Sequence, residues 1–264
     1  MPRAGPDSML VQISDPHIGA AQGGDPERDL ANAVRAVAAL RPRPDAVLLS
    51  GDLSEHARPE EYARVRELLE PLSMPVLPLP GNHDERAALR AAFPPPGEDG
   101  AEPDAPYRYA ATCGDLRLVV CDTALAGRPE GALDAEQRDW LEQRLAEAPD
   151  TPTIVAMHHP PLLTGMPAFD AVGLPAEDRA ALAELLGRWR QVRRVVAGHI
   201  HCASVSHLGD CVVLTAPSTW RFGPALRLGG EDFVFADNPA GFALHVLIDG
   251  EVVSHVQNVD AVAA

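Results

Sequence analysis

Five separate stretches of the chain place Asp, Asn or His side chains directly after a short hydrophobic run. Such side chains bind catalytic metal ions and transfer protons. In open α/β sheets, ligands bind beyond the carboxyl ends of the strands, so we expect the five stretches to meet in one crevice. They are Asp15-Pro16-His17, Gly51-Asp52, Gly81-Asn82-His83-Asp84, His158-His159 and Gly198-His199-Ile200-His201.

The donor types in these stretches indicate which metal ions could bind. Carboxylate, amide and imidazole groups suit Zn, Mn, Fe or Co, and the lack of a thiolate pattern argues against a structural zinc site. Seven candidate ligands are too many for one four-coordinate ion, but two ions sharing a carboxylate would use them all. We choose Asp52 as the shared ligand. Two carboxylates facing two cations leave a net positive charge that attracts a phosphate group.

The elements that must position these residues alternate between short apolar runs and amphipathic stretches, which predicts an α/β fold. Asp25-Pro26 and Pro59 are typical helix starts, and Asp249-Gly250 is typical of a hairpin turn. We predict helices over residues 26–40, 59–69, 85–92, 134–148 and 176–190. We predict strands over residues 9–13, 46–49, 75–79, 107–111, 116–121, 153–157, 194–197, 212–214, 242–248 and 252–256.

Length and composition indicate one domain over residues 1–264, with residues 1–8 and 260–264 as flexible tails. Hydrophobic residues make up 46% of the chain, which is enough for a substantial core. The sequence contains neither a signal-peptide pattern nor an apolar run of membrane-spanning length, so we expect a cytoplasmic protein without a membrane partner. The four cysteines show no CxxC spacing, and we expect them to be reduced.

The charge of the chain limits its partners. The formal net charge is −16, and every basic residue other than histidine is an arginine. No basic stripe is available to follow a nucleic-acid backbone. We therefore expect no long nucleic acid as partner or substrate.

The blocks DPH, GD, GNHD, HHPP and GHIH, in this order between residues 15 and 201, resemble the signature of the calcineurin-like metallophosphoesterases. The longer segments GDLSEHARPEEY, MHHPPLLTGMPAFDAVGL and APSTW resemble the class III cyclic nucleotide phosphodiesterases and the related glycerophosphodiesterases. This subgroup resemblance extends from about residue 9 to residue 256. It implies a four-layer α/β/β/α sandwich of two mixed β-sheets, with a dinuclear metal site on loops at the carboxyl ends of the strands.

The resemblance also implies a ligand set, position by position. The first metal ion would be held by Asp15, His17, Asp52 and His201. The second would be held by Asp52, Asn82, His158 and His199. His83 matches the residue that contacts the phosphate and assists the leaving oxygen, and we predict Asn82 and His83 as the catalytic side chains.

From these positions we expect a metal-dependent phosphodiesterase acting on a small phosphodiester, with 3′,5′-cAMP as the first choice. In this hypothesis a hydroxide held between the two metal ions attacks phosphorus in line, and the Asn82 amide neutralises charge on the phosphate. The alternatives are a diesterase for glycerophosphodiesters or 2′,3′-cyclic nucleotides, or a broad phosphoesterase. A non-catalytic scaffold is the least favoured hypothesis, because a scaffold would not need a desolvated cluster of polar groups.

For three further residues near these blocks, the sequence allows a structural role as well as a functional one. For Asp84 we prefer the N-cap of the following helix to a direct part in catalysis. We expect His159 behind the ligands or at the rim of the site. Asp170 is either structural or in contact with substrate. The surrounding segment, residues 165–174, would contribute to a homodimer contact, as is common among the similar proteins, or form a lid over the substrate.

Overall fold

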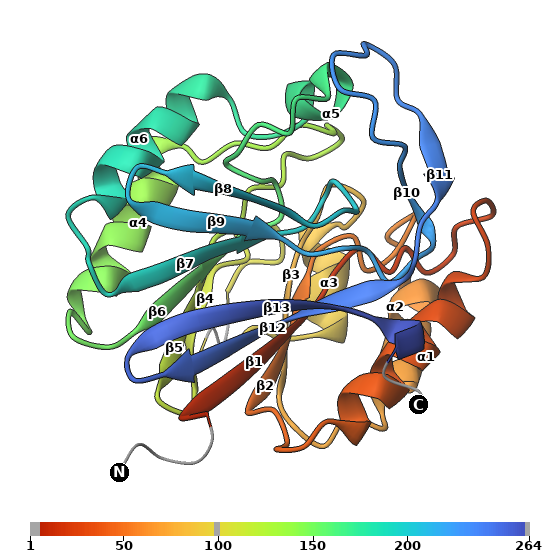
Figure 1. The fold of residues 1–264 in the computed structure, drawn as a ribbon, viewed down its shortest axis with the longest axis horizontal. Helices are drawn as coiled ribbons and strands as arrows, with labels where there is room; N and C mark the ends of the chain where they lie inside the picture. The colour runs from red at the N-terminus through yellow and green to blue at the C-terminus, as the bar shows by residue number, and fades with distance from the viewer. Residues whose placement is uncertain (1–5, 98–100, 262–264) are drawn as a thin grey trace.

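The computed structural model describes residues 6–97 and 101–261, and two mixed β-sheets lie at its centre (Figure 1). The first sheet has the strand order β13-β12-β1-β2-β3. Its strands β1, β2 and β3 run parallel, and β12 and β13 add an antiparallel hairpin to the other side of β1. The strand bounds are β1 Ser8–Ile13, β2 Ala46–Ser50, β3 Val76–Leu79, β12 Gly241–Ile248 and β13 Glu251–Asn258.

The second sheet has the strand order β4-β5-β6-β7-β9-β8. Strands β5, β6, β7 and β9 are parallel, whereas β4 and β8 at the two edges are antiparallel to their neighbours. The strand bounds are β4 Tyr109–Cys113, β5 Leu116–Val120, β6 Thr153–Ala156, β7 Val192–Ala197, β8 Ser204–Leu208 and β9 Cys211–Thr215. A separate two-stranded sheet pairs β10 Phe222–Pro224 with β11 Phe235–Asp237.

Helices cover the outer faces of both sheets, which gives four layers (Figure 1). Helices α1 to α3 lie on the first sheet, and α4 and α6 lie on the second. Short α5 precedes α6 and lies close to the segment that joins β10 to β11, through contacts of Phe169 with Phe233 and Phe235. The bounds are α1 Pro26–Ala39, α2 Pro59–Leu69, α3 Arg86–Ala92, α4 Ala135–Ala146, α5 Pro167–Ala171, α6 Ala176–Leu186 and the 3₁₀ turn η1 Val259–Ala261.

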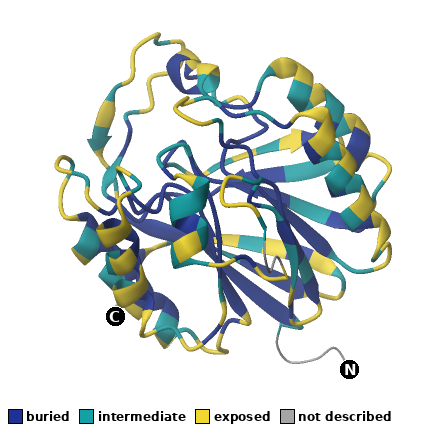
Figure 2. Ribbon diagram, turned by 180° about the vertical axis from the view of Figure 1, so that it is seen from behind, coloured by how far each residue is buried: buried dark blue, intermediate teal, exposed yellow. Residues whose placement is uncertain are grey.

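The alternation of side chains along the strands divides the core between the layers. In β5, Leu118 and Val120 belong to the cluster that includes the first sheet, whereas Val119 belongs to the cluster beneath α4 and α6. This is the period of two that a strand imposes when both of its faces are buried. Figure 2 shows the buried strands inside a more exposed ring of helices. The two mixed sheets and the sandwich predicted from the sequence are confirmed.

Several predicted boundaries need correction. Ser8 is buried as the first residue of β1, and the Asp7 amide donates to the Leu247 carbonyl, so these two residues are not part of a tail. Residue 260 likewise lies in η1. The other residues of the predicted tails, except Pro6 and Ala261, lie outside the described ranges. Helix α6 stops at Leu186 rather than at residue 190, with Gly187 as its C-cap. Strand β8, the β10–β11 pair and α5 were not predicted.

Within the described ranges, no helix has the length and apolar character needed to cross a membrane. The four cysteines are free thiols, and Cys113 and Cys121 are buried.

Candidate metal centre

Four predicted ligands of the first metal ion lie together at the ends of β1, β2 and β7. Donor atoms of Asp15, His17, Asp52 and His201 all lie within 4.8 Å of one another. His17 Nε2 is 3.1 Å from His201 Nε2 and 3.4 Å from Asp52 Oδ2, and His201 Nε2 is 3.6 Å from Asp15 Oδ1. The structure therefore brings this predicted set together.

The predicted ligands of the second metal ion lie beside the first set, next to Asp52. His158 Nε2 is 3.3 Å from Asp52 Oδ2 and 3.2 Å from Asn82 Oδ1. The imidazole rings of His158 and His199 have centroids 5.1 Å apart. Asp52 thus contacts one histidine of each set, as expected of a shared ligand.

Hydrogen bonds to one ring nitrogen fix the orientation of three of these histidines. His17 Nδ1 lies 2.7 Å from Glu55 Oε2, His158 Nδ1 lies 2.8 Å from the Ser50 carbonyl, and His201 Nδ1 lies 2.6 Å from the Phe222 carbonyl. Carbonyl and carboxylate oxygens only accept, so each Nδ1 carries a hydrogen and donates it. Each Nε2 then faces the other ligands, and its lone pair is available when the nitrogen carries no proton. This is the usual arrangement around metal-bound histidine.

The remaining histidine provides an independent test of fit to a metal ion. His199 Nε2 is buried and has no hydrogen-bond partner in the structure. A buried nitrogen without a partner costs free energy unless another group satisfies it. Burial, reinforced by neighbouring His158, lowers the pKa of His199 to about 3, so its lone pair is free at neutral pH. The donor set fits a bound cation at this position.

The charge balance around Asp52 leads to the same interpretation. Burial opposes ionisation of Asp52, but His158 and His17 outweigh it and hold the Asp52 pKa well below its usual value. Burial also opposes protonation of both histidines, but Asp52 overcomes it and raises the pKa of His17 to about 10 and of His158 to about 9. Without a cation these rings therefore carry protons that a metal ion would replace.

The backbone is strained where the ligands lie. Among the described residues, seven other than glycine have positive φ, and five of them are predicted ligands. Such conformations persist only where the surrounding structure enforces them, and they concentrate at functional sites. The five ligands are Asp15 (51°), His17 (46°), Asp52 (50°), His199 (72°) and His201 (51°).

Glycines let the loops approach closely enough for the ligands to meet. A Cβ on Gly51 would lie 2.2 Å from His158 Nδ1, and one on Gly81 would lie 2.1 Å from Asp52 Oδ1. A Cβ on Gly198 would lie 2.2 Å from Ser14 Oγ. No larger residue fits at these three positions without displacing a ligand or its support.

His83 lies at the edge of the cluster, where a catalytic side chain can reach substrate. Its backbone N–H donates to Asp52 Oδ1 at 2.9 Å, and its ring packs edge-on against His17 with centroids 4.7 Å apart. His83 Nδ1 is 3.1 Å from the Glu55 carbonyl, which leaves Nε2 as the ring nitrogen that can serve the leaving oxygen. Both His83 and Asn82 line the cavity beside the cluster.

The prediction that Asp84 caps a helix is wrong. Helix α3 begins after Glu85, and no side chain caps it. The Asp84 carboxylate accepts hydrogen bonds from the backbone N–H groups of Gly81, Leu53 and Ser54 and from the Tyr62 hydroxyl. It therefore joins the loop that carries Asp52 to the loop that carries Asn82 and His83. The local sequence favoured a cap, but these long-range contacts determine its position.

His159 and Asp170, whose roles the sequence left open, both make structural contacts. His159 is fully buried behind the ligands, with Nδ1 2.9 Å from Thr123 Oγ1 and its ring 4.6 Å from that of His199. Asp170 accepts hydrogen bonds from Thr164 and Gly165 and holds its own loop together. The surrounding segment nevertheless reaches the site, because Phe169 and Val172 line the cavity.

Sequence reasoning missed Glu55 and the aromatic lining of the cavity. Glu55 joins His17 and His83, and a carboxylate three residues after Asp52 was the available signal. The cavity has a volume of about 260 Å³ and is lined by predicted metal ligands, by His83 and by aromatic rings. Its aromatic lining consists of Phe169, Trp220, Phe222, Phe233 and Phe235.

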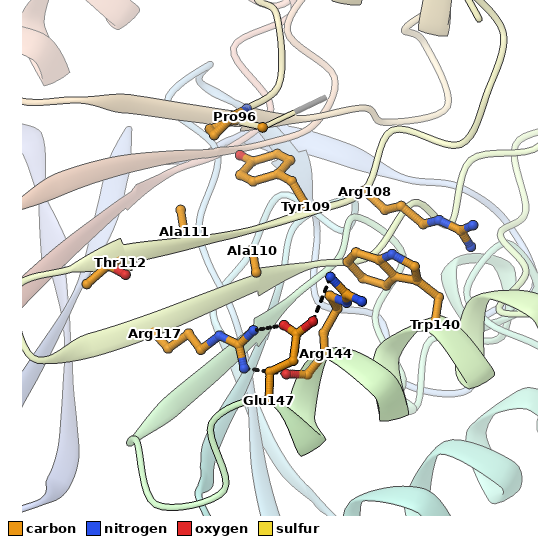
Figure 3. A pocket seen from close by; sticks show the side chains of 11 residues that line it. Pro96, Arg108, Tyr109, Ala110, Ala111, Thr112, Arg117, Trp140, Arg144 and Glu147 are labelled. Atoms are coloured by element: carbon orange, nitrogen blue, oxygen red, sulfur yellow. Dashed lines mark hydrogen bonds and ion pairs between the residues drawn. The ribbon is translucent and has the colours of Figure 1, made fainter. Parts of the chain in front are cut away.

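A larger cavity of about 530 Å³ lies elsewhere, beside the edge strand β4 and α4 (Figure 3). None of the predicted ligands lines it. Arg117 and Arg144 both pair with Glu147 at 2.8 Å, and Arg108 pairs with Glu136 at 2.9 Å. Because its arginines are neutralised by these acids, size alone does not make it the better candidate for the reaction.

The ligand geometry and the layered fold agree with the family comparison. The sequence pattern of the family described as calcineurin-like phosphoesterase matches residues 9–203. The chain belongs to this family. It is a metal-dependent phosphoesterase, and its candidate metal centre is the group of Asp15, His17, Asp52 and His201 together with the neighbouring His158, His199 and Asn82.

Relatives with known names extend the comparison. The chain is 36% identical over 220 residues to the glycerophosphodiester phosphodiesterase GpdQ of Enterobacter lignolyticus, covering 80% of this chain and 77% of the relative. It is 32% identical over 261 residues to the 3′,5′-cyclic adenosine monophosphate phosphodiesterase CpdA of Pseudomonas aeruginosa, covering 96% and 91%. A dimetal phosphatase from Danio rerio shares the fold with a TM-score of 0.73 at 16% identity, covering 96% and 97%.

Proposed function

We propose that this metal-dependent phosphodiesterase hydrolyses cyclic nucleotides, with 3′,5′-cAMP as the preferred substrate among the diesters named here. The observation that carries the proposal is the meeting of seven ligand side chains around Asp52 beside a cavity of about 260 Å³. A cavity of this size, lined by both polar and aromatic side chains, suits a small phosphodiester that has a flat substituent.

We propose two bound metal ions, each Fe, Mn, Zn or Co. Asp15, His17, Asp52 and His201 would hold one, and Asp52, Asn82, His158 and His199 the other. When bound, the two ions would activate a water molecule and neutralise charge on the phosphate oxygens. Glu55, Ser50 and Phe222 fix the ring orientations of the histidines before any ion binds, so the site is organised in advance.

The remaining steps fall to the residues at the cavity. The Asn82 amide can donate to a nonbridging phosphate oxygen from its position beside His158. His83 is 36% exposed in its side chain, so it can contact a bound substrate while its Nδ1 stays near the Glu55 carbonyl. We assign to it the transfer of a proton to the departing alkoxide.

A glycerophosphodiester is the second candidate substrate, supported by the 36% identity to the glycerophosphodiester phosphodiesterase. The names of other relatives support the first candidate, including a cAMP/cGMP dual specificity phosphodiesterase of Mycobacterium tuberculosis at 36% identity over 228 residues. The aromatic side of the cavity also favours a substrate with a planar group.

The test is a comparison of kcat/KM for the metal-loaded protein on a panel of substrates. The panel contains 3′,5′-cAMP, 3′,5′-cGMP, 2′,3′-cAMP, glycerophosphoethanolamine and p-nitrophenyl phosphate. We expect the highest kcat/KM on a 3′,5′-cyclic nucleotide. The highest value on glycerophosphoethanolamine would establish the second candidate, and a clear preference for the monoester would contradict both.

A further inference from the structure

A series of aromatic contacts leads from the metal centre to the β10–β11 hairpin. The ring of His17 contacts Trp220 with centroids 5.0 Å apart, and Trp220 contacts Phe222 at 4.8 Å. Phe222 in turn stacks on Phe235 at 4.4 Å and 12°. The hairpin therefore joins the candidate catalytic site through rings, and its far end forms the outer part of the same cavity.

At that end, three phenylalanine rings form an open box. Phe233 and Phe235 are parallel within 8°, with centroids 6.4 Å apart. Phe169 of α5 stands at 74° to Phe233 and 72° to Phe235, with centroids 5.0 and 5.7 Å away, and closes one side. Phe233 is 51% exposed and Phe235 is 40% exposed. Neighbouring phenylalanines left this open to water, and continuous with a catalytic site, are typical of a surface that a ligand covers.

We propose that this aromatic box, formed by Phe169, Phe233 and Phe235, binds the nucleobase of the substrate while the phosphate lies at Asp52. The inference rests on the proposed cyclic nucleotide activity. It makes the β10–β11 hairpin the element that determines substrate specificity. The box offers ring faces and no ionic side chain of its own, so it recognises a flat, uncharged group.

The distance between the Phe233 and Phe235 rings favours a nucleobase over a quaternary ammonium, which is another group that aromatic rings bind. A flat ring between two others needs about 3.5 Å on each side, hence walls about 7 Å apart. A trimethylammonium group is thicker and needs walls roughly 9 Å apart at the same contact distances. The 6.4 Å between the Phe233 and Phe235 centroids is an upper limit on the separation of the two ring planes, so the box must widen for either group, and by less for a flat ring. Strands β10 and β11 pair over three residues each, so a small widening meets little resistance.

The first experiment measures how the ratio of kcat/KM for 3′,5′-cAMP to that for glycerophosphoethanolamine responds to change in the box. Phe233→Leu and Phe235→Leu keep apolar bulk but remove the flat face. Stacking of a base on one aromatic side chain is strong enough that we expect the ratio to fall about tenfold or more in each variant. Phe235→Tyr keeps the ring face and should restore most of the ratio.

The matched control is Leu228→Ala. Leu228 lies in the same connection between β10 and β11 and is 75% exposed, but it does not line the cavity. We expect an unchanged ratio in this variant. If Leu228→Ala lowers the ratio as much as Phe235→Leu does, the effect belongs to the hairpin as a whole and the aromatic box is wrong.

A second experiment separates the box from the proposed function. Inhibition of glycerophosphoethanolamine hydrolysis by AMP is compared with inhibition by ribose 5-phosphate, which lacks the base. We expect AMP to inhibit at least tenfold more tightly in the wild type and to lose this advantage in Phe235→Leu. If AMP keeps the advantage while cAMP is not hydrolysed, the box stands and the proposed substrate fails. Equal inhibition by both compounds overturns the box, as does tighter inhibition by glycerophosphocholine than by AMP.

Discussion

Substitution of Gly51 by alanine is the most specific structural test of the metal centre. Gly51 has φ of +92° and lies directly before Asp52, the proposed shared ligand. A Cβ at this position would lie 2.2 Å from His158 Nδ1 and 2.9 Å from the Gly81 amide nitrogen. His158 has no exposed surface, and its Nδ1 donates to the Ser50 carbonyl at 2.8 Å, so the ring has no free space into which to move.

The expected magnitude follows from these distances. Ordinary van der Waals contact begins at 3.4 Å, so the His158 ring or the Gly51 backbone must move by about 1 Å. Metal ligands tolerate displacements of roughly 0.2 Å, and a misplacement of about 1 Å in a catalytic site costs about 100-fold in rate. The positive φ itself costs about 1–2 kcal/mol of folding free energy for alanine. We therefore expect loss of the metal ion bound by His158 and a fall of at least about 100-fold in kcat/KM.

The assay compares Gly51→Ala with Gly250→Ala after loading with saturating Mn²⁺. Gly250 has a similar φ of +80°, but nothing lies within 4 Å of its Cβ position, in the turn between β12 and β13. Both variants should lose the folding free energy that the positive φ costs, Gly51→Ala should lose more because of its clash with His158, and only Gly51→Ala should lose metal in elemental analysis. If folded Gly51→Ala binds two metal ions and keeps the wild-type kcat/KM, His158 does not act as a ligand in the position described.

Three further predictions address other parts of the account. Asp52→Asn should lower the metal content from two ions per chain to one or none, because Asp52 contacts a histidine of each ligand set. Elemental analysis of the variant and the wild type measures this content, and an unchanged value would exclude Asp52 as the shared ligand. His83→Ala should keep both ions and lose about 10²- to 10⁴-fold in kcat, as expected for a proton-transfer residue; full activity on a poor leaving group would disprove the role. Burial, with Arg194 nearby, lowers the pKa of His245 to about 3, so its neutral form contributes stability that is full above the unfolded value of 6.5 and declines as pH falls towards 3. Unfolding free energy should therefore drop by about 2 kcal/mol more between pH 7 and pH 5 in wild type than in His245→Gln, and equal slopes in urea titrations would contradict this.

The convergence of the candidate ligands could be predicted because each of them follows a strand within two to four residues. Once β1, β2, β3, β6 and β7 are recognised as strands, their carboxyl ends define where the polar side chains gather. The end of each strand fixes the position of its ligand, and the close packing of the loops at Gly51, Gly81 and Gly198 brings the ligands together. The alternating pattern predicted the layers for the same reason, since it directly reflects which faces are buried.

The features that the sequence did not reveal depend on contacts between distant segments. Asp84 satisfies the local pattern of a cap, but it joins the loop after β2 to the loop after β3. The aromatic box combines Phe169 of α5 with Phe233 and Phe235, which are more than sixty residues further along the chain. Strands β10 and β11 have three residues each, which is too short for an alternating pattern to show. Glu55 gains its importance only once the fold brings His17 and His83 to it.

The most direct test of the central claim is the number of metal ions bound and their separation. Protein loaded with Mn²⁺ and freed of excess metal is measured by elemental analysis and by electron paramagnetic resonance. Two Mn²⁺ ions per chain with an exchange-coupled spectrum are predicted, because both clusters share Asp52. One ion or none per chain, or two ions with the spectrum of isolated Mn²⁺, would contradict the account.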